Sequence, residues 1–126
     1  MRYFDHDITD KDLLKALCDE KRYRIDAEVG EIYSVRTGKP LARENPASFG
    51  GKTNRDCIRI SVKGKRRHVS VAKAIWMFDR RATVPKMCEV HHSNEDSSDN
   101  RGVNLVCIFE ADHHLVHKLL SGSAPF

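Results

Sequence analysis

Five of the seven histidines lie between residues 91 and 117, and their spacing is the feature of this sequence that points most directly to chemistry. His91 and His92 are adjacent, whereas His113 and His117 are four residues apart. Side chains four residues apart on a helix have Cβ atoms about 6 Å apart on one face, so two imidazoles can reach one metal ion. Either pair alone is typical of surface histidines. The two pairs together, with Asn104 between them, indicate a functional site.

The residues around these histidines predict the order strand, loop, strand, helix. Cys88 to His92 is a short extended run, and residues 93–103 are rich in Ser, Asn, Asp and Gly, which predicts a loop. Residues 104–109 favour a second strand, and residues 112–120 favour a helix that Gly122 ends. Adjacent residues of a strand point to opposite faces, but a strand that ends at His92 can turn both imidazoles toward one site.

The predicted helix at 112–120 has an apolar side with the two spaced histidines at its edge. That side comprises Leu115, Val116, Leu119 and Leu120. His113 and His117 border it, whereas His114 lies further toward solvent. An edge position suits ligands that face a neighbouring hairpin, and whether His113 or His114 pairs with His117 is left open.

The first two thirds of the chain predict the elements that must position this site. Thr9 caps a helix over residues 9–18, and residues 23–35 predict a hairpin around Val29-Gly30. Residues 36–54 predict a loop, and residues 58–62 and 67–71 predict a second hairpin around Lys63-Gly64-Lys65. Ser70 caps a helix over 71–80, whose expected inward residues are Ala72, Ile75, Trp76 and Phe78.

The basic residues are concentrated in one segment. Lys52–Lys86 holds 11 basic and two acidic residues and so carries +9, whereas the whole chain of 126 residues carries +4. A basic block in a folded segment suits a polyanionic partner, most simply a nucleic acid, although a solvated lysine-rich hairpin has the same composition.

Composition narrows the class of protein further. The longest apolar run, 74–78, is far too short to cross a membrane, and no secretory signal is present, so we expect a soluble, cytoplasmic protein without a membrane partner. The four cysteines include no Cys-x-x-Cys pair and are expected to be small buried side chains, with an accessory role left open for Cys88 and Cys107.

Residues 86–120 resemble the HNH endonuclease motif, which is the ββα-metal or His-Me finger fold. The resemblance is carried by Glu89-Val90-His91-His92, Asp99-Asn100-Arg101, Asn104-Leu105 and Asp112-His113-x-x-x-His117. The histidine doublet and the His-x-x-x-His helix are most similar to the colicin-type nucleases. The basic hairpin and helix at 57–80 resemble, more weakly, the N-terminal part of HNH proteins from phages and mobile introns.

The resemblance implies a role for each matching residue. His92 would be the general base, and His91, His113 and His117 would be the metal ligands. Asn104 would be the middle asparagine, which braces the loop that carries the base. Neutral imidazole, with a pKa of about 6.5, suits a base at neutral pH, and a bound cation can stabilise the leaving 3′-oxygen.

Further residues are assigned supporting roles. Lys63, Lys65, Arg66 and Arg67 at the hairpin tip, with Arg101 in the loop, are predicted to contact phosphates. Glu89 and Asn100 are candidates for orienting a ligand or the base, although an ordinary strand-edge glutamate and a solvated loop arginine are alternatives for Glu89 and Arg101.

The sequence departs from many phage members, and the departures bear on the metal. His91 stands where many members have Asp, and Ser93-Asn94-Glu95-Asp96 follows the base in place of Ile-Asp-Gly-Asn. Three neutral imidazoles favour zinc or nickel as the bound ion over magnesium, which prefers oxygen ligands. We therefore expect one divalent ion, with Mg²⁺ or Mn²⁺ as candidates for turnover and Zn²⁺ or Ni²⁺ for the resident ion.

These observations predict one α+β domain over residues 1–126. Residues 1–54 form an N-terminal helix, hairpin and loop, residues 55–85 a basic hairpin and helix, and residues 86–122 the ββα-metal motif. The predicted function is a metal-dependent, phage-type HNH endonuclease that nicks DNA or cleaves both strands and leaves a 5′-phosphate and a 3′-hydroxyl. DNA is the expected partner and no protein partner is predicted. The alternative is a non-catalytic, zinc-structured DNA-binding module.

Overall fold

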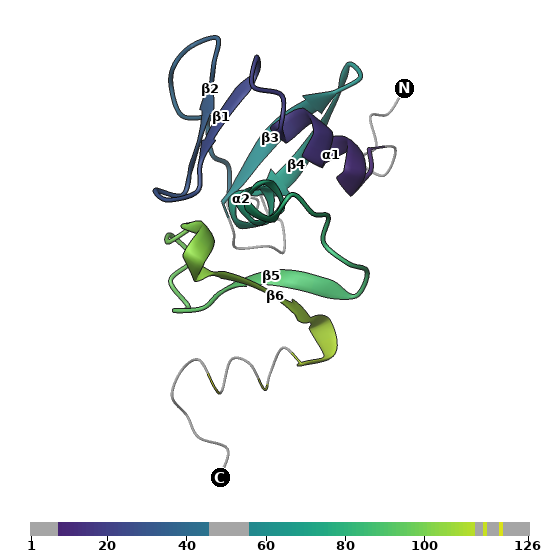
Figure 1. Cartoon of the computed structure of the whole chain (residues 1–126), viewed down its shortest axis with the longest axis vertical. Helices are drawn as coiled ribbons and strands as arrows, with labels where there is room; N and C mark the ends of the chain where they lie inside the picture. The colour runs from purple at the N-terminus through teal and green to yellow at the C-terminus, as the bar shows by residue number, and fades with distance from the viewer. Residues whose placement is uncertain (1–7, 46–55, 113–114, 116–118, 120–126) are drawn as a thin grey trace.

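We describe the fold from a computed structural model, and its described residues form three antiparallel hairpins and the two α-helices α1 and α2. The structure describes residues 8–45 and 56–112, together with Leu115 and Leu119. The hairpins are β1 (Tyr23–Asp26) with β2 (Glu31–Ser34), β3 (Cys57–Val62) with β4 (Lys65–Ser70), and β5 (Cys88–His92) with β6 (Leu105–Phe109). Helix α2 lies between the β3–β4 hairpin and the β5–β6 hairpin (Figure 1). The fold is therefore of the α+β class that the sequence predicts.

Helix α1 (Asp10–Leu17) begins at Thr9, as predicted. The Thr9 hydroxyl accepts from the Asp12 amide and the Asp12 carboxylate accepts from the Thr9 amide, which satisfies two amides that a helix leaves without partners. Leu13 and Leu17 are buried. The Asp10 carboxylate lies 3.0 Å from Lys73 Nζ and 3.1 Å from Arg67 Nη2, so the first turn of α1 is linked to both β4 and α2.

The β3–β4 hairpin has a tighter turn than the sequence predicts. Lys63 and Gly64 both take positive φ, at 52° and 76°, which is the conformation of a two-residue turn that matches the twist of the strands. Strand β4 therefore begins at Lys65 rather than at Arg67. Ile58, Ile60 and Val62 alternate along β3 and are buried in the core.

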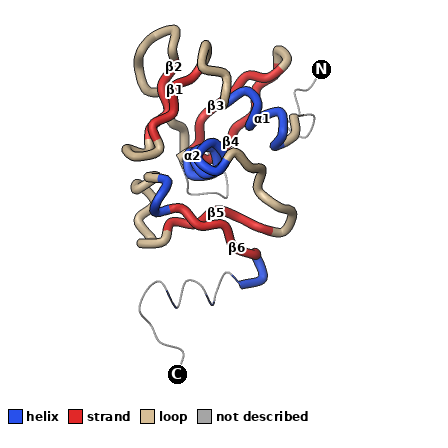
Figure 2. The backbone as a smooth tube through the Cα atoms, viewed as in Figure 1, coloured by secondary structure: helices blue, strands red, loops and turns tan. Residues whose placement is uncertain are grey.

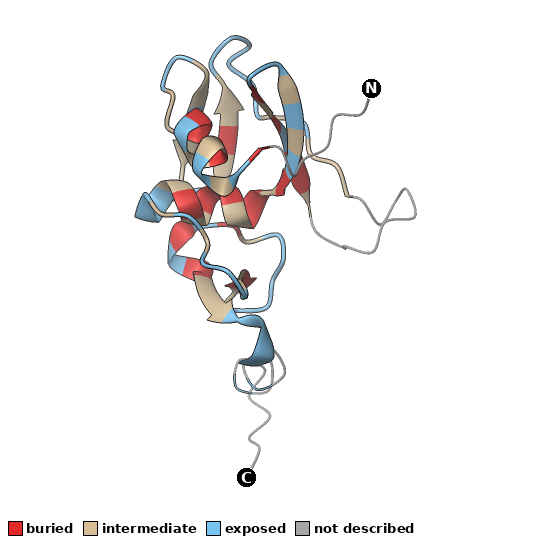
Figure 3. Cartoon of the chain, turned by 90° about the vertical axis from the view of Figure 1, so that its right-hand side faces the viewer, coloured by how far each residue is buried: buried red, intermediate tan, exposed pale blue. Residues whose placement is uncertain are grey.

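Helix α2 (Val71–Arg80) is the centre of the core (Figures 2 and 3). The Ser70 hydroxyl caps it by accepting from the Lys73 amide at 3.0 Å, as predicted. The predicted set of inward residues is wrong in part. Trp76 and Phe78 are only half-buried, whereas Ala74 and Met77 are buried. The reason is that α2 has elements packed on several sides, including α1, β4 and β5, so its buried residues do not form one stripe.

The β5–β6 hairpin is joined to α2 by apolar packing and by one arginine. Val90 and Leu105 are buried in the same core as α2. Arg80, at the last turn of α2, donates to the carbonyl oxygens of Gly102 at 3.2 Å and Leu105 at 3.1 Å. One carbonyl group just before β6 and one at its first residue therefore have a donor on the helix.

The end of the chain is described only in part. The 3-10 turn η3 (Gly102–Asn104) precedes β6, and a second 3-10 turn, η4 (Glu110–Asp112), follows it. Most of the helix predicted at 112–120 lies outside the described residues. Leu115 and Leu119, on the apolar side of that predicted helix, are about half exposed, at 51% and 56%. Among the described residues, no helix is long and apolar enough to cross a membrane.

Candidate active site

Alternation along β5 places the two adjacent histidines on opposite faces of the β5–β6 hairpin. His92 pairs with Leu105 in the strand register and shares a face with the buried Val90, so it lies on the side that faces α2. His91 shares the other face with Glu89. His91 is buried, with only 4% of its surface exposed, whereas His92 is half-buried. The two imidazoles therefore have separate surroundings.

His92 is held by the side chain of Asn100. His92 Nε2 lies 2.8 Å from Asn100 Oδ1, and Asn100 is almost fully buried. Because an amide oxygen only accepts hydrogen bonds, Nε2 carries the proton and Nδ1 is left with a lone pair. The sequence indicated Asn100 as a candidate for orienting a ligand or the base, and the structure brings it to His92.

A small hollow adjoins His92. Its volume is about 10 Å³, close to the smallest volume that holds one water molecule. Its lining comes from the loop after β5, the segment before β3 and the start of α2: Asp56, Ser70, Ala72, His92, Ser97 and Asn100. The sequence did not indicate Asp56, Ser70 or Ala72 as neighbours of His92, because only the packing of α2 against β5 brings them there.

His91 is paired with Glu89 on the other face. His91 Nε2 lies 2.8 Å from Glu89 Oε1, and the two residues are two positions apart on one strand face. Two ligands of an ion with bonds of about 2.0–2.1 Å are themselves about 3 Å apart. The pair can thus hold one divalent ion together, or Glu89 can orient His91 as a single ligand.

The remaining predicted ligands lie outside the described residues. These are His113 and His117, together with the alternative His114. Within the described part of the chain, no three His, Cys, Asp or Glu side chains are close enough to hold a metal ion. The four cysteines are free thiols, of which Cys57 is buried and the other three are half-buried. Burial raises the pKa of the Cys107 thiol, and the neighbouring Cys88 raises it further.

Asn104 ties together the two ends of the loop that follows His92. Its Nδ2 donates to Asn94 Oδ1 and to the Asp99 carbonyl oxygen, each at 2.9 Å, and its Oδ1 accepts from the Asn94 amide at 3.1 Å. Asn104 is the last residue of η3, so the predicted strand at 104–109 begins one residue later, at Leu105. The reason is that the Asn104 amide closes the turn on the Arg101 carbonyl oxygen at 2.9 Å.

Arg101 is engaged within the same loop. Its Nε and Nη2 donate to the two carboxylate oxygens of Asp99, both at 2.8 Å. These hydrogen bonds hold the pKa of Asp99 far below its usual 3.8 and raise the pKa of Arg101. Arg101 remains about half exposed, so one edge of its guanidinium faces solvent.

The basic side chains of the β3–β4 hairpin do not share one environment. Arg66 is exposed and Lys63 extends into solvent with its ammonium 3.7 Å from Asp12. Arg67 instead packs against α1, where it donates to the Ile8 carbonyl oxygen at 2.8 Å and contacts Asp10. Lys65 is half-buried. The exposed part of the predicted phosphate-binding set thus includes Lys63 and Arg66 but not Arg67.

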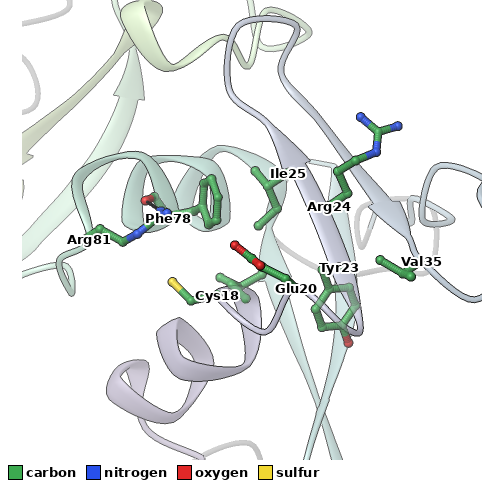
Figure 4. A pocket seen from close by; sticks show the side chains of 9 residues that line it. Cys18, Glu20, Tyr23, Arg24, Ile25, Val35, Phe78 and Arg81 are labelled. Atoms are coloured by element: carbon green, nitrogen blue, oxygen red, sulfur yellow. Dashed lines mark hydrogen bonds between the residues drawn. The ribbon is translucent and has the colours of Figure 1, made fainter.

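A larger cavity lies beside the C-terminal end of α2 and contains none of the predicted site residues. Its volume is about 360 Å³, and it is lined by Leu17, Cys18, Glu20, Tyr23, Arg24, Ile25, Val35, Phe78 and Arg81 (Figure 4). The Arg81 guanidinium lies over the Phe78 ring, 4.0 Å from its centre. This cavity is separate from the hollow beside His92, which adjoins the other end of the helix.

Comparison with known proteins identifies the fold. No family model and no curated protein matches the sequence. A solved structure described as "DNA binding and cleavage by the HNH homing endonuclease I-HmuI" is similar, with a TM-score of 0.59 and 18% sequence identity. The match covers 83% of this chain and 56% of that chain. The chain therefore has the fold of an HNH endonuclease, as the resemblance of its histidine and asparagine motifs predicted.

Proposed function

We propose that this protein is a metal-dependent HNH endonuclease that hydrolyses phosphodiester bonds in DNA. The observation that carries the proposal is the pairing of His92 with buried Asn100 at the end of β5, beside a hollow of about one water molecule. The fold similarity to an HNH homing endonuclease supports the same chemistry. We infer that His92 is the general base and that Asn104 braces the loop that carries its partner.

The arrangement of His92 suits proton transfer from water. Asn100 Oδ1 accepts from Nε2, so the lone pair on Nδ1 is available to take a proton. The water oxygen then bonds to phosphorus, the bond from phosphorus to the 3′-oxygen breaks, and the water proton passes to His92. The products are a 5′-phosphate and, once the 3′-oxygen is protonated, a 3′-hydroxyl.

His91 and Glu89 are the described residues that suit a metal ion. An imidazole nitrogen and a carboxylate oxygen 2.8 Å apart fit two ligands of one divalent ion, and this mixed donor set accommodates zinc, nickel or manganese. We propose that His113 and His117 complete the site. A bound cation would supply charge stabilisation for the phosphate and the leaving oxygen.

We propose that DNA lies along the exposed basic side chains. Lys63 and Arg66 on the β3–β4 hairpin and the exposed edge of Arg101 would contact phosphates, with Lys65 beside them. Arg67 contributes to this surface indirectly, because its contacts with Asp10 and Ile8 hold the hairpin against α1.

A plasmid-nicking assay tests the function. Purified protein is stripped with EDTA and incubated with supercoiled plasmid alone or with Mg²⁺, Mn²⁺, Zn²⁺ or Ni²⁺. Metal-dependent conversion to open circles or linear DNA, absent in His92→Ala, is the expected result. Retention of DNA in a gel-shift assay without cleavage under any metal would instead select the non-catalytic DNA-binding module.

A further inference from the structure

The turn between β1 and β2 lies directly against the loop that carries Asn100 (Figure 1). Gly30, in this turn, has a φ of +82°, and a Cβ atom there would lie 2.6 Å from the Asn100 carbonyl carbon and 2.8 Å from the Arg101 amide nitrogen. Both contacts are with backbone, which cannot rotate away as a side chain can. The turn and the loop therefore meet at a spacing that only glycine permits.

A hydrogen bond between backbone groups also joins the turn to the loop. The Gly102 amide donates to the Ala27 carbonyl oxygen at 2.8 Å. The turn itself is shaped by Asp26, whose carboxylate accepts from the Glu28 amide at 3.1 Å and the Val29 amide at 3.2 Å. Residues 100–102 thus rest on a turn that is ordered by its own hydrogen bonds.

A single residue, Asn100, links this contact to His92. The backbone of Asn100 meets Gly30, and the side chain of the same residue lies 2.8 Å from His92 Nε2. Because Asn100 is almost fully buried, a shift of its backbone moves its amide oxygen with it. A displacement of the β1–β2 turn would therefore change the distance between Asn100 and His92.

Arg43 links the turn to the far wall of the hollow. Its Nη2 donates to the Gly30 carbonyl oxygen at 3.3 Å and to Glu31 Oε1 at 2.8 Å, and its Nη1 lies 3.8 Å from Asp56 Oδ2. Asp56 lines the hollow beside His92. The turn is thus connected to the site both through Asn100 and through Arg43.

We propose that Gly30 is a positioning residue: the β1–β2 turn holds the Asn100 backbone where its side chain orients the imidazole of His92. The effect on catalysis rests on the proposed function, whereas the effect on the His92 imidazole does not. The N-terminal hairpin then acts in the chemistry of the β5–β6 hairpin although it supplies no group that touches the substrate.

The test compares Gly30→Asn with Gly38→Asn. Asn tolerates positive φ, so this substitution adds a Cβ atom that collides with the backbone of residues 100 and 101 while adding little backbone strain in the turn itself. Gly38 is the matched control, because its φ is +71° and a Cβ atom there meets nothing within 4 Å. We expect Gly30→Asn to lower kcat about 10- to 100-fold with KM for plasmid within about two-fold, and Gly38→Asn to change neither.

A spectroscopic readout separates this proposal from the proposed function. ¹⁵N chemical shifts of the His92 ring, measured in the protein alone, are expected to report a proton on Nε2 in wild type and in Gly38→Asn. In Gly30→Asn they should report a mixture of the two tautomers. If wild type does not cut DNA, the proposed function fails while this comparison still decides the role of Gly30.

Two results would overturn the proposal. One is a Gly30→Asn protein whose kcat and His92 ring shifts match those of Gly38→Asn. If Gly30→Asn does not fold, Arg43→Met replaces it, since that change loosens the turn without inserting an atom. Unchanged kcat and ring shifts in folded Arg43→Met would then be the overturning result, and a drop in kcat at constant KM the supporting one.

Discussion

Asn100 Oδ1 lies 2.8 Å from His92 Nε2, so a buried amide fixes which nitrogen of the half-exposed imidazole carries the proton. The loop from Ser93 to Gly102 carries Asn100 and brings its side chain to His92. Hydrogen bonds within the hairpin hold this loop, including Asn104 Nδ2 to Asn94 Oδ1 and Arg101 Nη2 to Asp99 Oδ2. The candidate base is therefore oriented before any substrate arrives.

The first prediction separates the base from the metal ligands. His92→Ala should remove cleavage while zinc and DNA binding stay close to wild type, because the base does not bind the metal. Asn100→Ala should retain residual cleavage, about 10- to 100-fold below wild type. Calorimetric titration with zinc, run beside the cleavage assay, checks both variants. Loss of zinc binding in His92→Ala would contradict the assignment.

The second prediction concerns Asn104. Asn104→Asp keeps the shape of the side chain but removes the two donors that hold Asn94 Oδ1 and the Asp99 carbonyl oxygen. We expect the free energy of unfolding to fall by about 1–3 kcal/mol, since the buried side chain at position 104 loses both of the hydrogen bonds that it donates. Urea denaturation measures it. Ser98→Ala, at an exposed position of the same loop, is the control and should change stability by less than about 0.5 kcal/mol.

The third prediction divides the basic hairpin into two groups. Replacing Lys63, Lys65 and Arg66 with Ser should weaken DNA binding similarly for unrelated sequences and flatten its salt dependence, because fewer counterions are released. Arg67→Ser should instead lower the free energy of unfolding by about 1–3 kcal/mol, since it breaks the bonds to Asp10 and Ile8. Gel shifts across a salt series and urea denaturation distinguish the two effects. An unchanged salt slope in the triple variant would place the DNA elsewhere.

The fourth prediction concerns the metal. A site that is absent from the unfolded chain adds its binding energy to folding, so EDTA should lower Tm. His91→Ala and His117→Ala should reproduce most of that drop, whereas His114→Ala should not. Thermal melts with and without one equivalent of Zn²⁺ provide the measurement. Equal destabilisation by His114→Ala and His117→Ala would make His114, rather than His113, the ligand that accompanies His117.

The fifth prediction is a pH dependence from the pair of Asp99 and Arg101. The hydrogen bonds from Arg101 depress the pKa of Asp99 in the folded protein below its usual 3.8. A depressed carboxyl pKa adds stability above the unfolded value, and that stability is lost as pH falls below about 4. Arg101→Gln should therefore lower Tm at pH 7, and the difference from wild type should shrink toward pH 3. A difference that is constant across this range would mean that the pair contributes nothing through ionisation.

The sequence predicted the elements whose signals are local. Thr9 and Ser70 have the side chains that cap helices, and Lys63-Gly64-Lys65 favours a turn, so the helices and hairpins of residues 9–80 are predicted closely, apart from the start of β4. The run Cys88–His92 was predicted to the residue. The inward residues of α2 were predicted less well, because a periodic pattern assumes one covered face and this helix has several.

The surroundings of the site were harder to predict because they arise from contacts distant in sequence. Nothing near His92 in the sequence indicates that Asp56 or Ala72 lies beside it. Gly30 looked like an ordinary turn glycine, and its contact with Asn100 spans 70 residues of chain. The sequence groups the basic residues by position alone, and only the placement of α1 shows that Arg67 contacts Asp10 whereas Arg66 is exposed.

The hydrogen bonds from Arg80 mean that residues 86–122 do not carry all of their own supporting contacts. Grafting that stretch alone onto another scaffold would leave the Gly102 and Leu105 carbonyl groups without the guanidinium that now satisfies them. It would also uncover Val90 and Leu105, which rest on α2. A chimaera that retains these contacts with α2 should therefore start no later than Ser70, so that the helix is transferred together with the hairpin that it supports.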